Sequence, residues 1–240
     1  MPTIRAGSAK PLKGNSPWDT LRQSIANLGT VVRHMQPTWH APTIDALTPA
    51  FLEQQQVRGV IWDVDGTLTS HHGAQVEPAL APAFRRLVEA SNVRHVIVSN
   101  APDARFTQLA QLFPDIPILR LYALHGEVIP HRLHGSRNSL SREEFDALQA
   151  AGAVVLRKPN ARLTQYALQE LDCSASEALM IGDQFMTDVA GARMADVRAL
   201  KVETAAPGSF PFVVRTAQHI EQVLYTVVYG TRRSLAGRVS

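Results

Sequence analysis

Two aspartates separated by one residue, Asp63 and Asp65, follow directly on a short apolar run in this chain. The run, Val-Ile-Trp at residues 60–62, has the near-continuous apolar character of a buried strand in a parallel sheet. Ligands of such sheets bind at the carboxyl ends of the strands, so the two acids are expected at a ligand site. Two carboxylates this close resist joint ionisation, and a divalent cation relieves their repulsion. The pair therefore predicts a site that binds a cation.

Three further apolar runs also end in polar side chains, at what we expect to be the same edge of the sheet. These polar residues are Ser99 and Asn100, then Lys158, and then Asp183 with Asp188 five positions later. Each ending alone has an ordinary structural explanation, such as a turn, a helix cap or a solvated lysine. Four endings of fitting chemical type are hard to assign to chance, so we interpret them together.

The set fits phosphoryl transfer. Asp63 can attack phosphorus and form an aspartyl-phosphate, which splits hydrolysis into two easier displacements. Asp65 is placed to protonate the leaving oxygen and later to deprotonate the attacking water. These roles need the two acids to titrate apart, with Asp63 ionised while Asp65 holds a proton in part of the cycle. Lys158 is the third catalytic candidate, because its ammonium offsets phosphate charge as the nucleophile approaches.

Candidates for binding the phosphate follow the first two strands. The Ser99 hydroxyl, with Asn100 and the neighbouring backbone N–H groups, is expected to hold the non-bridging phosphate oxygens. Gly66 and Thr67 belong to the same group, because Gly66 allows a tight turn directly after Asp65 and Thr67 can hydrogen-bond within that turn.

The predicted metal ligands are Asp63, Asp65 and Asp183. Carboxylate oxygens suit a hard cation, and Mg²⁺ is the predicted choice. Asp188 is a supporting residue, placed to orient Lys158 or a metal-bound water.

Strand-like and helix-like segments alternate along the chain, which is typical of βαβ units and of an α/β fold with a parallel sheet covered on both faces. Expected strands lie near residues 57–62, 93–98, 117–123, 153–156, 178–181 and 198–202. Expected helices lie near residues 18–35, 49–56, 78–90, 102–112, 141–150 and 160–171, up to about 194, and around 220–228. Thr48-Pro49 is expected to begin one helix, and Ser141 with Glu144 forms a capping box for another.

We divide the chain into residues 1–36, 37–215 and 216–240. The first part has an aperiodic tail and then an amphipathic helix, whose apolar stripe is expected to dock on the core or on a sister chain. Interfacial membrane binding by this helix is the alternative. The middle part is the catalytic core, in which the insertion at residues 124–152 either closes over an anionic headgroup or is a surface excursion. The last part is a helix with a frayed tail.

The composition is that of an ordinary globular protein, with 240 residues, 45% of them hydrophobic and 19% charged. The net charge of +3 suits an anionic substrate or an acidic membrane surface, although solvated lysines and arginines explain it equally well. The single cysteine, Cys173, fits a reducing compartment. No apolar run approaches the ~20 residues of a membrane span.

We expect a cytoplasmic protein, peripheral at a membrane if the substrate is a lipid, with no nucleic-acid partner. A basic leader that weakly resembles an organelle transit segment is the alternative, and the oligomeric state stays open.

Four short sequences resemble, in order, the four motifs of the haloacid dehalogenase (HAD) superfamily. They are Asp-Val-Asp-Gly-Thr-Leu at residues 63–68, Val-Ser-Asn at 98–100, Arg-Lys-Pro at 157–159 and Gly-Asp-Gln-Phe-Met-Thr-Asp at 182–188. An acid at position 65 resembles the phosphatases of the superfamily. The last motif, with Pro-x-Ile-x-x-Leu-x-Pro at residues 42–49, is similar to subfamily IIIA, the phosphatidylglycerophosphate phosphatase-like group.

The resemblance covers roughly residues 37–202. It implies a three-layer Rossmann-like core without a large cap domain, Mg²⁺ as cofactor and an aspartyl-phosphate intermediate. The first hypothesis is a Mg²⁺-dependent phosphomonoester phosphatase acting on a lipid phosphate such as phosphatidylglycerophosphate. The same chemistry on a soluble sugar or nucleotide phosphate is the second. A binding module that keeps the pocket without turnover is the non-enzymatic alternative, and the retention of every catalytic residue type argues against it.

Overall fold

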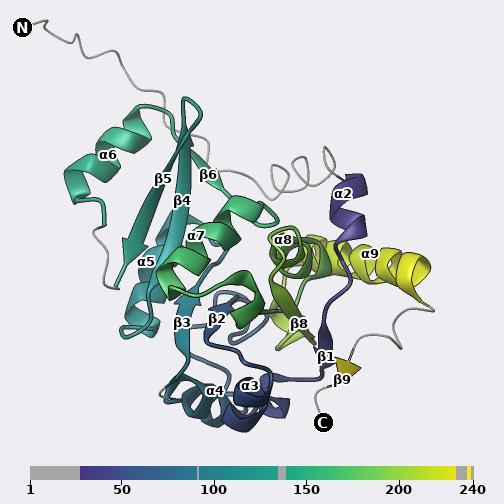
Figure 1. The fold of residues 1–240 in the computed structure, drawn as a ribbon. Helices are drawn as coiled ribbons and strands as arrows, with labels where there is room; N and C mark the ends of the chain where they lie inside the picture. The colour runs from purple at the N-terminus through teal and green to yellow at the C-terminus, as the bar shows by residue number, and fades with distance from the viewer. Residues whose placement is uncertain (1–27, 91, 135–138, 231–236, 239–240) are drawn as a thin grey trace, which may run out of the picture.

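A computed structural model describes residues 28–90, 92–134, 139–230 and 237–238 of the chain (Figure 1). The strands of this part are β1 (Trp39–Ala41), β2 (Gly59–Trp62), β3 (Arg94–Ile97), β4 (Ile118–Leu124), β5 (Glu127–Leu133), β6 (Val154–Leu156), β7 (Ala178–Gly182), β8 (Arg198–Val202) and β9 (Gly237–Arg238). They form one sheet in the order β5-β4-β3-β2-β7-β8-β1-β9, with β6 paired to β4. The centre of the sheet is parallel, as the alternation of strands and helices predicts.

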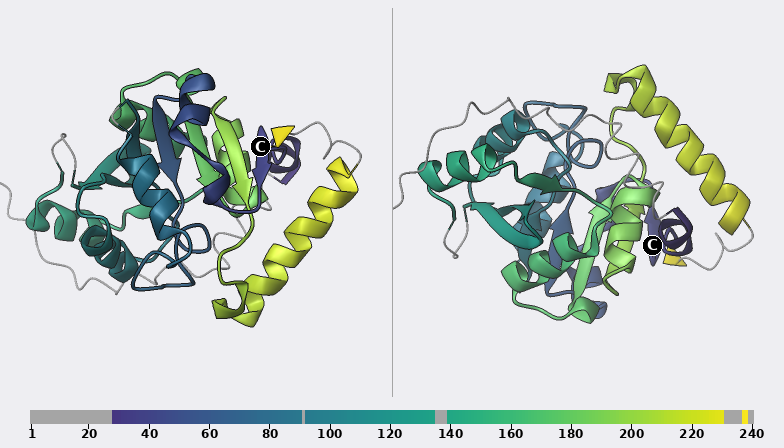
Figure 2. Two further views of the ribbon diagram at one scale, coloured as in Figure 1. Left: turned by 90° about the horizontal axis from the view of Figure 1, so that it is seen from below. Right: turned by 90° about the horizontal axis from the view of Figure 1, so that it is seen from above.

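The helices are α2 (Leu28–Arg33), α3 (Pro49–Gln54), α4 (Ala81–Val88), α5 (Asp103–Leu112), α6 (Arg142–Ala150), α7 (Ala161–Leu171), α8 (Ala190–Arg193) and α9 (Phe212–Tyr229). Four single turns complete the described elements: η1 (Ile44–Ala46), η2 (Ala175–Glu177), η3 (Phe185–Val189) and η4 (Pro207–Ser209). Helices α3, α4 and α5 pack on one face of the sheet, and α2, α7, α8 and α9 pack on the other (Figure 2). The predicted three-layer α/β architecture is confirmed.

Strand β2 shows how the sequence builds the two cores. Val60 and Trp62 belong to the core under α3, α4 and α5, while Ile61 belongs to the core on the opposite face. Successive side chains of a strand point to opposite faces, so an apolar run is what a strand buried on both sides requires. The four residues of β2 are all buried.

Local helix signals in the sequence agree with the structure. Thr48 caps α3 through a hydrogen bond from the N–H of Phe51, and Pro49 is the first residue of that helix. Ser141 and Glu144 form the expected capping box of α6. These bonds satisfy backbone N–H groups that have no partner inside the helix.

The expected strand at residues 153–156 exists as β6, but it differs from the other strands that end near the site. Strand β6 pairs antiparallel with β4, as does β5 on the other side. Ile118, at the start of β4, pairs with Ile97, at the end of β3, so most of β4 projects beyond the parallel sheet. Whether residues 124–152 close over a headgroup or are a surface excursion stays a prediction. Their described parts form a hairpin and a helix that widen this projection, with Tyr122, Leu148 and Ala153 as a small core of their own.

The predicted N-terminal helix is described only from Leu28 onward, as α2, and residues 1–27 lie outside the described part. Val31 and Met35 are fully buried against α8 and α9, and the Tyr229 hydroxyl donates to the carbonyl of Val32. In the described part, the apolar stripe therefore docks on the core. Strand β1, between two prolines, was not predicted from the sequence.

The closing helix is longer than predicted, and the expected boundary at residue 216 falls inside it. Helix α9 begins at Phe212, and its inner face buries Glu221, Tyr225 and Tyr229. Most of the aliphatic residues that predict this helix, such as Ile220 and Val227, point outward instead. No helix among the described residues is long and apolar enough to cross a membrane.

Candidate active site

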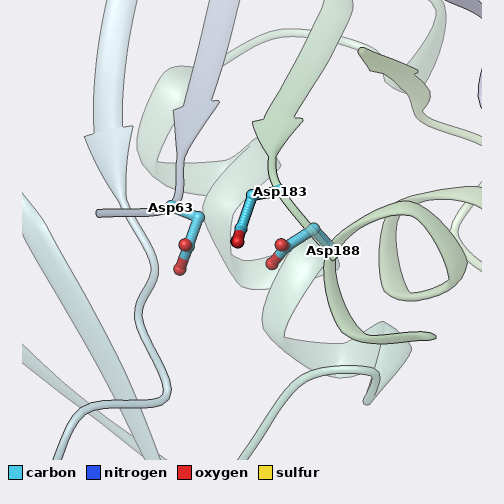
Figure 3. Close-up of side chains that lie close together, drawn as sticks. All are labelled: Asp63, Asp183 and Asp188. Atoms are coloured by element: carbon cyan, nitrogen blue, oxygen red, sulfur yellow. The ribbon is translucent and has the colours of Figure 1, made fainter. Parts of the chain in front are cut away.

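Three aspartates converge at the carboxyl edge of the sheet, as Figure 3 shows. Asp63 follows β2, and Asp183 follows the neighbouring strand β7. Asp188 is carried by η3, the turn that continues from β7. One carboxylate oxygen from each of the three lies within 4.8 Å of the others, and all three residues are buried. Adjacent parallel strands end at the same level, which is why residues 120 positions apart in the chain meet here.

The ammonium of Lys158 lies between two of these acids. Its Nζ atom is 2.5 Å from Asp63 Oδ1 and 2.7 Å from Asp188 Oδ1. Burial by itself lowers the pKa of Lys158, but the charges of Asp188 and Asp63 outweigh it and raise the pKa above its ordinary value. The lysine is therefore a permanent cation of the site.

The acids outnumber this cation. Burial raises the pKa of Asp63 to about 7, an effect that Lys158 opposes and Asp188 reinforces. Burial also raises the pKa of Asp183 well above its ordinary value; the charges of Asp63 and Asp188 add to the shift, and Lys201 opposes it. Three ionised carboxylates against the Lys158 ammonium would leave a net charge of about −2 on these four buried groups. A divalent cation would compensate this charge and return the acids to their ionised forms.

The donor set fits such a cation. Asp183 Oδ2 accepts hydrogen bonds from the Thr204 hydroxyl at 2.8 Å and the Gln218 amide at 3.3 Å. Asp183 Oδ1 is buried and has no hydrogen-bond partner in the described chain. A buried carboxylate oxygen without a donor is costly, and a hard cation that binds oxygen ligands would satisfy it.

The turn after Asp63 leaves no room for a larger residue than glycine. Gly66 has a φ of +93°, and a Cβ atom there would lie 2.7 Å from Asp183 Oδ2. The Thr67 hydroxyl donates to Asp63 Oδ2 at 3.2 Å. Gly66 and Thr67 therefore shape the approach of Asp63 to Asp183, and their predicted contact with phosphate stays a prediction.

The carboxylate of Asp65 is held by donors from three other residues. Its Oδ1 atom accepts from Arg105 Nη2 at 2.8 Å and from the Thr69 hydroxyl and the His72 N–H, both at 3.2 Å. Its carboxylate is not part of the three-acid group, and Asp188 stands in its place. The carboxylates that the structure groups are those of Asp63, Asp183 and Asp188, and metal binding by Asp65 stays a prediction. Asp65 Oδ2 takes part in none of these bonds, which suits a proton-transfer role.

The Ser-Asn pair after β3 is also engaged within the chain. Both polar atoms of the Asn100 amide bind the main chain of Lys158, with Oδ1 accepting from its N–H at 2.8 Å and Nδ2 donating to its carbonyl at 3.1 Å. Ser99 Oγ accepts from the N–H of Ala101 at 3.2 Å. Asn100 thus positions Lys158 in the structure, and phosphate binding by Ser99 and Asn100 stays a prediction.

Among the residues that support the acids, sequence reasoning missed three that come from helices. Arg105 comes from α5, while Gln218 and Glu221 come from α9. The Glu221 carboxylate accepts from the N–H groups of Phe185 and Met186, at the start of η3. None of these residues follows a strand, so the rule that points to strand ends could not find them.

Comparisons with known proteins agree with this site. Residues 22–112 match the family model described as mitochondrial PGP phosphatase, and residues 155–208 match the model described as HAD-hydrolase-like. The phosphatidylglycerophosphate phosphatase 1, chloroplastic, of Chlamydomonas reinhardtii is 27% identical over 191 residues, which cover 78% of this chain and 59% of the relative. The phospholysine phosphohistidine inorganic pyrophosphate phosphatase of Bos taurus is 46% identical over 52 residues, or 22% of this chain and 19% of the relative. This chain thus matches less than two thirds of either relative's length.

Among solved structures, an uncharacterized protein from Listeria monocytogenes serotype 4b aligns with a TM-score of 0.39 and 17% identity, over 63% of this chain and 88% of that one. The family models and the algal relative confirm the predicted resemblance and support a phosphatase of the HAD type. Within that class, the chain is similar to the phosphatidylglycerophosphate phosphatases.

Proposed function

We propose that the chain is a Mg²⁺-dependent phosphomonoester hydrolase that works through an aspartyl-phosphate on Asp63. The observation that carries this proposal is the position of the Asp63 carboxylate, which is buried at the end of β2, touches Lys158 Nζ at 2.5 Å and lies beside Asp183 and Asp188. A nucleophilic carboxylate must meet an anionic phosphate, so cations have to surround it. Lys158 is one such cation, and the carboxylate oxygens of the three aspartates are ligands for a second.

The first displacement makes the covalent intermediate. An Asp63 oxygen forms a bond to phosphorus as the bond from phosphorus to the leaving oxygen breaks. Asp65 Oδ2 gives its proton to that leaving oxygen, and the leaving group departs as an alcohol while the phosphoryl group stays on Asp63. Lys158 offsets the negative charge of the phosphate oxygens while the two anions approach.

The second displacement restores the enzyme. Water attacks the same phosphorus and gives a proton to Asp65, and the bond between phosphorus and Asp63 breaks. Inorganic phosphate is released, and Asp65 is again protonated. Mg²⁺, held by Asp63 and Asp183 with Asp188 beside them, would supply charge neutralisation for the phosphate oxygens.

For the substrate we propose a lipid phosphate of the phosphatidylglycerophosphate kind. The support is the likeness to a family model and to an algal relative whose names state that activity. Because a lipid phosphate lies in a membrane, we propose that the protein acts at a membrane surface. The names of the family model and of the relative refer to a mitochondrion and a chloroplast, so that membrane would face the cytoplasm or belong to an organelle.

A matched pair of variants tests the chemistry. Asp63→Asn keeps the shape of the side chain and removes the nucleophile, and we expect phosphate release from 4-nitrophenyl phosphate to fall by roughly 10³-fold or more. Asp115→Asn, at an exposed position outside the site, is expected to leave the rate unchanged. Equal rates in wild type and Asp63→Asn would overturn the assigned nucleophile.

A substrate panel tests the substrate class. Phosphate release is measured from phosphatidylglycerophosphate in mixed micelles and from soluble sugar and nucleotide phosphates, each with Mg²⁺ and with EDTA. We expect the lipid to give the highest kcat/KM, and EDTA to abolish every activity. Preference for a soluble ester would contradict the lipid assignment and leave the chemistry standing.

A further inference from the structure

One helix of the described chain carries most of its exposed large hydrophobic residues. Eight large hydrophobic residues are exposed among the described residues, and six of them are on α9. The six are Phe212, Val213, Ile220, Val223, Val227 and Val228. Figure 2 shows α9 at the margin of the molecule, beyond β1 and β8. A single exposed valine is normal, but six on one helix mark an interaction surface.

From this surface we infer that the outer face of α9 docks on the anionic surface of a lipid bilayer. The inference rests on the proposed lipid-phosphate substrate, and it names the part of the chain that would meet the membrane. We define the α9 outer face as the six residues above. Amphipathic helices bind bilayers by burying such a face at the boundary between headgroups and acyl chains.

The charges of α9 suit an anionic lipid surface. The helix has one acidic residue, Glu221, and that residue is buried on the inner face. The solvent side of α9 therefore presents no acid that would repel phosphate headgroups. Arg215 and His219 are exposed on it. Basic side chains next to an apolar face attract anionic lipids.

A protein partner fits the same face less well. Protein interfaces concentrate their binding energy in tyrosine, tryptophan and arginine anchors. The two tyrosines of α9, Tyr225 and Tyr229, point inward and are buried. The α9 outer face is instead five aliphatic residues and one phenylalanine along the length of the helix, which offers apolar area without specific anchors.

The inner face of the same helix touches the candidate active site. Gln218 binds Asp183, and Glu221 binds the N–H groups of Phe185 and Met186. Gln218 also lines a cavity of about 600 Å³ between α9 and the ends of β1 and β8, which Thr204 lines as well. A bilayer on the α9 outer face would therefore lie one helix thickness, ~10 Å, from the site.

Flotation of the full chain with vesicles tests the surface. The vesicles contain phosphatidylcholine with about 30% phosphatidylglycerol, and we expect wild type to float with them. The double variant Val223→Asp with Val227→Asp is expected to lower the bound fraction about tenfold, because it places two carboxylates on the apolar face. Val154→Asp is the control, since Val154, on the distant strand β6, is 45% exposed, close to the 49% of Val223, and the variant should float like wild type.

Hydrolysis of 4-nitrophenyl phosphate is measured on every variant and is expected to stay within about twofold of wild type, since these substitutions touch none of the site residues. If the aspartate pair does not fold, Val223→Gln with Val227→Gln replaces it.

Several outcomes would overturn the inference. The first is a wild type that does not float, and the second is a double variant that floats as well as wild type. The third is sedimentation in which wild type is a dimer and the double variant is a monomer. The last result would assign the face to a second copy. Failure of the proposed chemistry would look different, because flotation would then persist while no phosphomonoester is hydrolysed.

Discussion

The guanidinium of Arg105 is bound to the carboxylate of Asp65, with 2.8 Å between Nη2 and Oδ1. The arginine side chain is only 2% exposed, so this ion pair is largely shielded from water on its cationic side. The same Oδ1 atom accepts two further hydrogen bonds. One oxygen of Asp65 is thus fixed by three donors, and the other is left to exchange a proton with the substrate.

We expect Arg105→Gln to impair protonation of the leaving group. For an alkyl phosphate, whose departing oxygen needs a proton, kcat/KM should fall by about 10–100-fold. For 4-nitrophenyl phosphate, whose phenolate leaves unaided, the loss should be less than about tenfold. Arg94→Gln, which removes an exposed arginine paired with Asp172, is the control. Equal losses on both esters would show that Arg105 has no part in orienting the acid.

Mg²⁺ should stabilise the protein through the acid cluster. At a concentration about 100 times its Kd, a ligand that binds only the folded state adds about 2.7 kcal/mol, which for a chain of this size raises Tm by about 5–10 °C. Asp183→Asn removes the carboxylate whose Oδ1 has no partner, and it should abolish most of this shift. Calorimetry with and without Mg²⁺ measures the effect, and Asp115→Asn serves as the control. A full shift in Asp183→Asn would remove Asp183 from the metal site.

The buried carboxyl of Glu221 predicts a dependence of stability on pH. Burial raises its pKa from 4.5 to about 7 in the folded protein, despite the two backbone N–H groups that it accepts from. The folded state therefore holds the proton more tightly than the unfolded chain. The contribution of Glu221 to the free energy of unfolding is complete below pH 4.5, and it declines by roughly 3 kcal/mol as the pH rises through 7.

Glu221→Gln should remove this decline, because the amide stays neutral while its oxygen can still accept from Phe185 and Met186. Denaturant melts of both proteins at pH 5 and pH 8 give the difference in slope. Parallel pH profiles of the two free energies of unfolding would contradict a proton on Glu221.

Two glycines separate the cost of backbone strain from the cost of crowding the site. Gly66 and Gly126 have nearly the same positive φ, +93° and +89°, but only at Gly66 would a Cβ meet other atoms. Gly126→Ala should cost about 1–2 kcal/mol from its backbone alone. Gly66→Ala should cost more and should also reduce stabilisation by Mg²⁺, since its methyl group would push on Asp183. Similar losses of stability and an unchanged Mg²⁺ effect would show that the contact with Asp183 is unimportant.

The parallel part of the fold could be read from the sequence because buried strands are nearly continuous apolar runs. The strand ends then place Asp63 and Asp183 at one edge, and the structure has them there. Strand β6 shows where this reasoning stops. Its apolar run does not reveal that it pairs antiparallel with β4, because strand direction depends on pairing and not on composition. Lys158 therefore reaches the site by a route that the sequence does not show.

The contacts of Arg105, Gln218 and Glu221 could not be predicted for a related reason. Each lies within a helix, where a polar residue is most often solvated, and only the packing of that helix on the sheet turns it toward the acids. Helix α9 is the clearest example. Its apolar residues predict a helix with a buried stripe, but Tyr225 and Tyr229 fill the core and the aliphatic residues face outward.

Asn100 binds both the N–H and the carbonyl of Lys158, and so it fastens two segments that are 58 residues apart in the chain. All of the antiparallel projection lies between these two fastened points. Its hairpin and helix can therefore grow, shrink or change composition without displacing the ammonium from Asp63. The Asn100 amide separates the chemistry from the antiparallel projection, and it leaves the part of that projection beyond Ile118 free to change its contacts with whatever the phosphate is attached to.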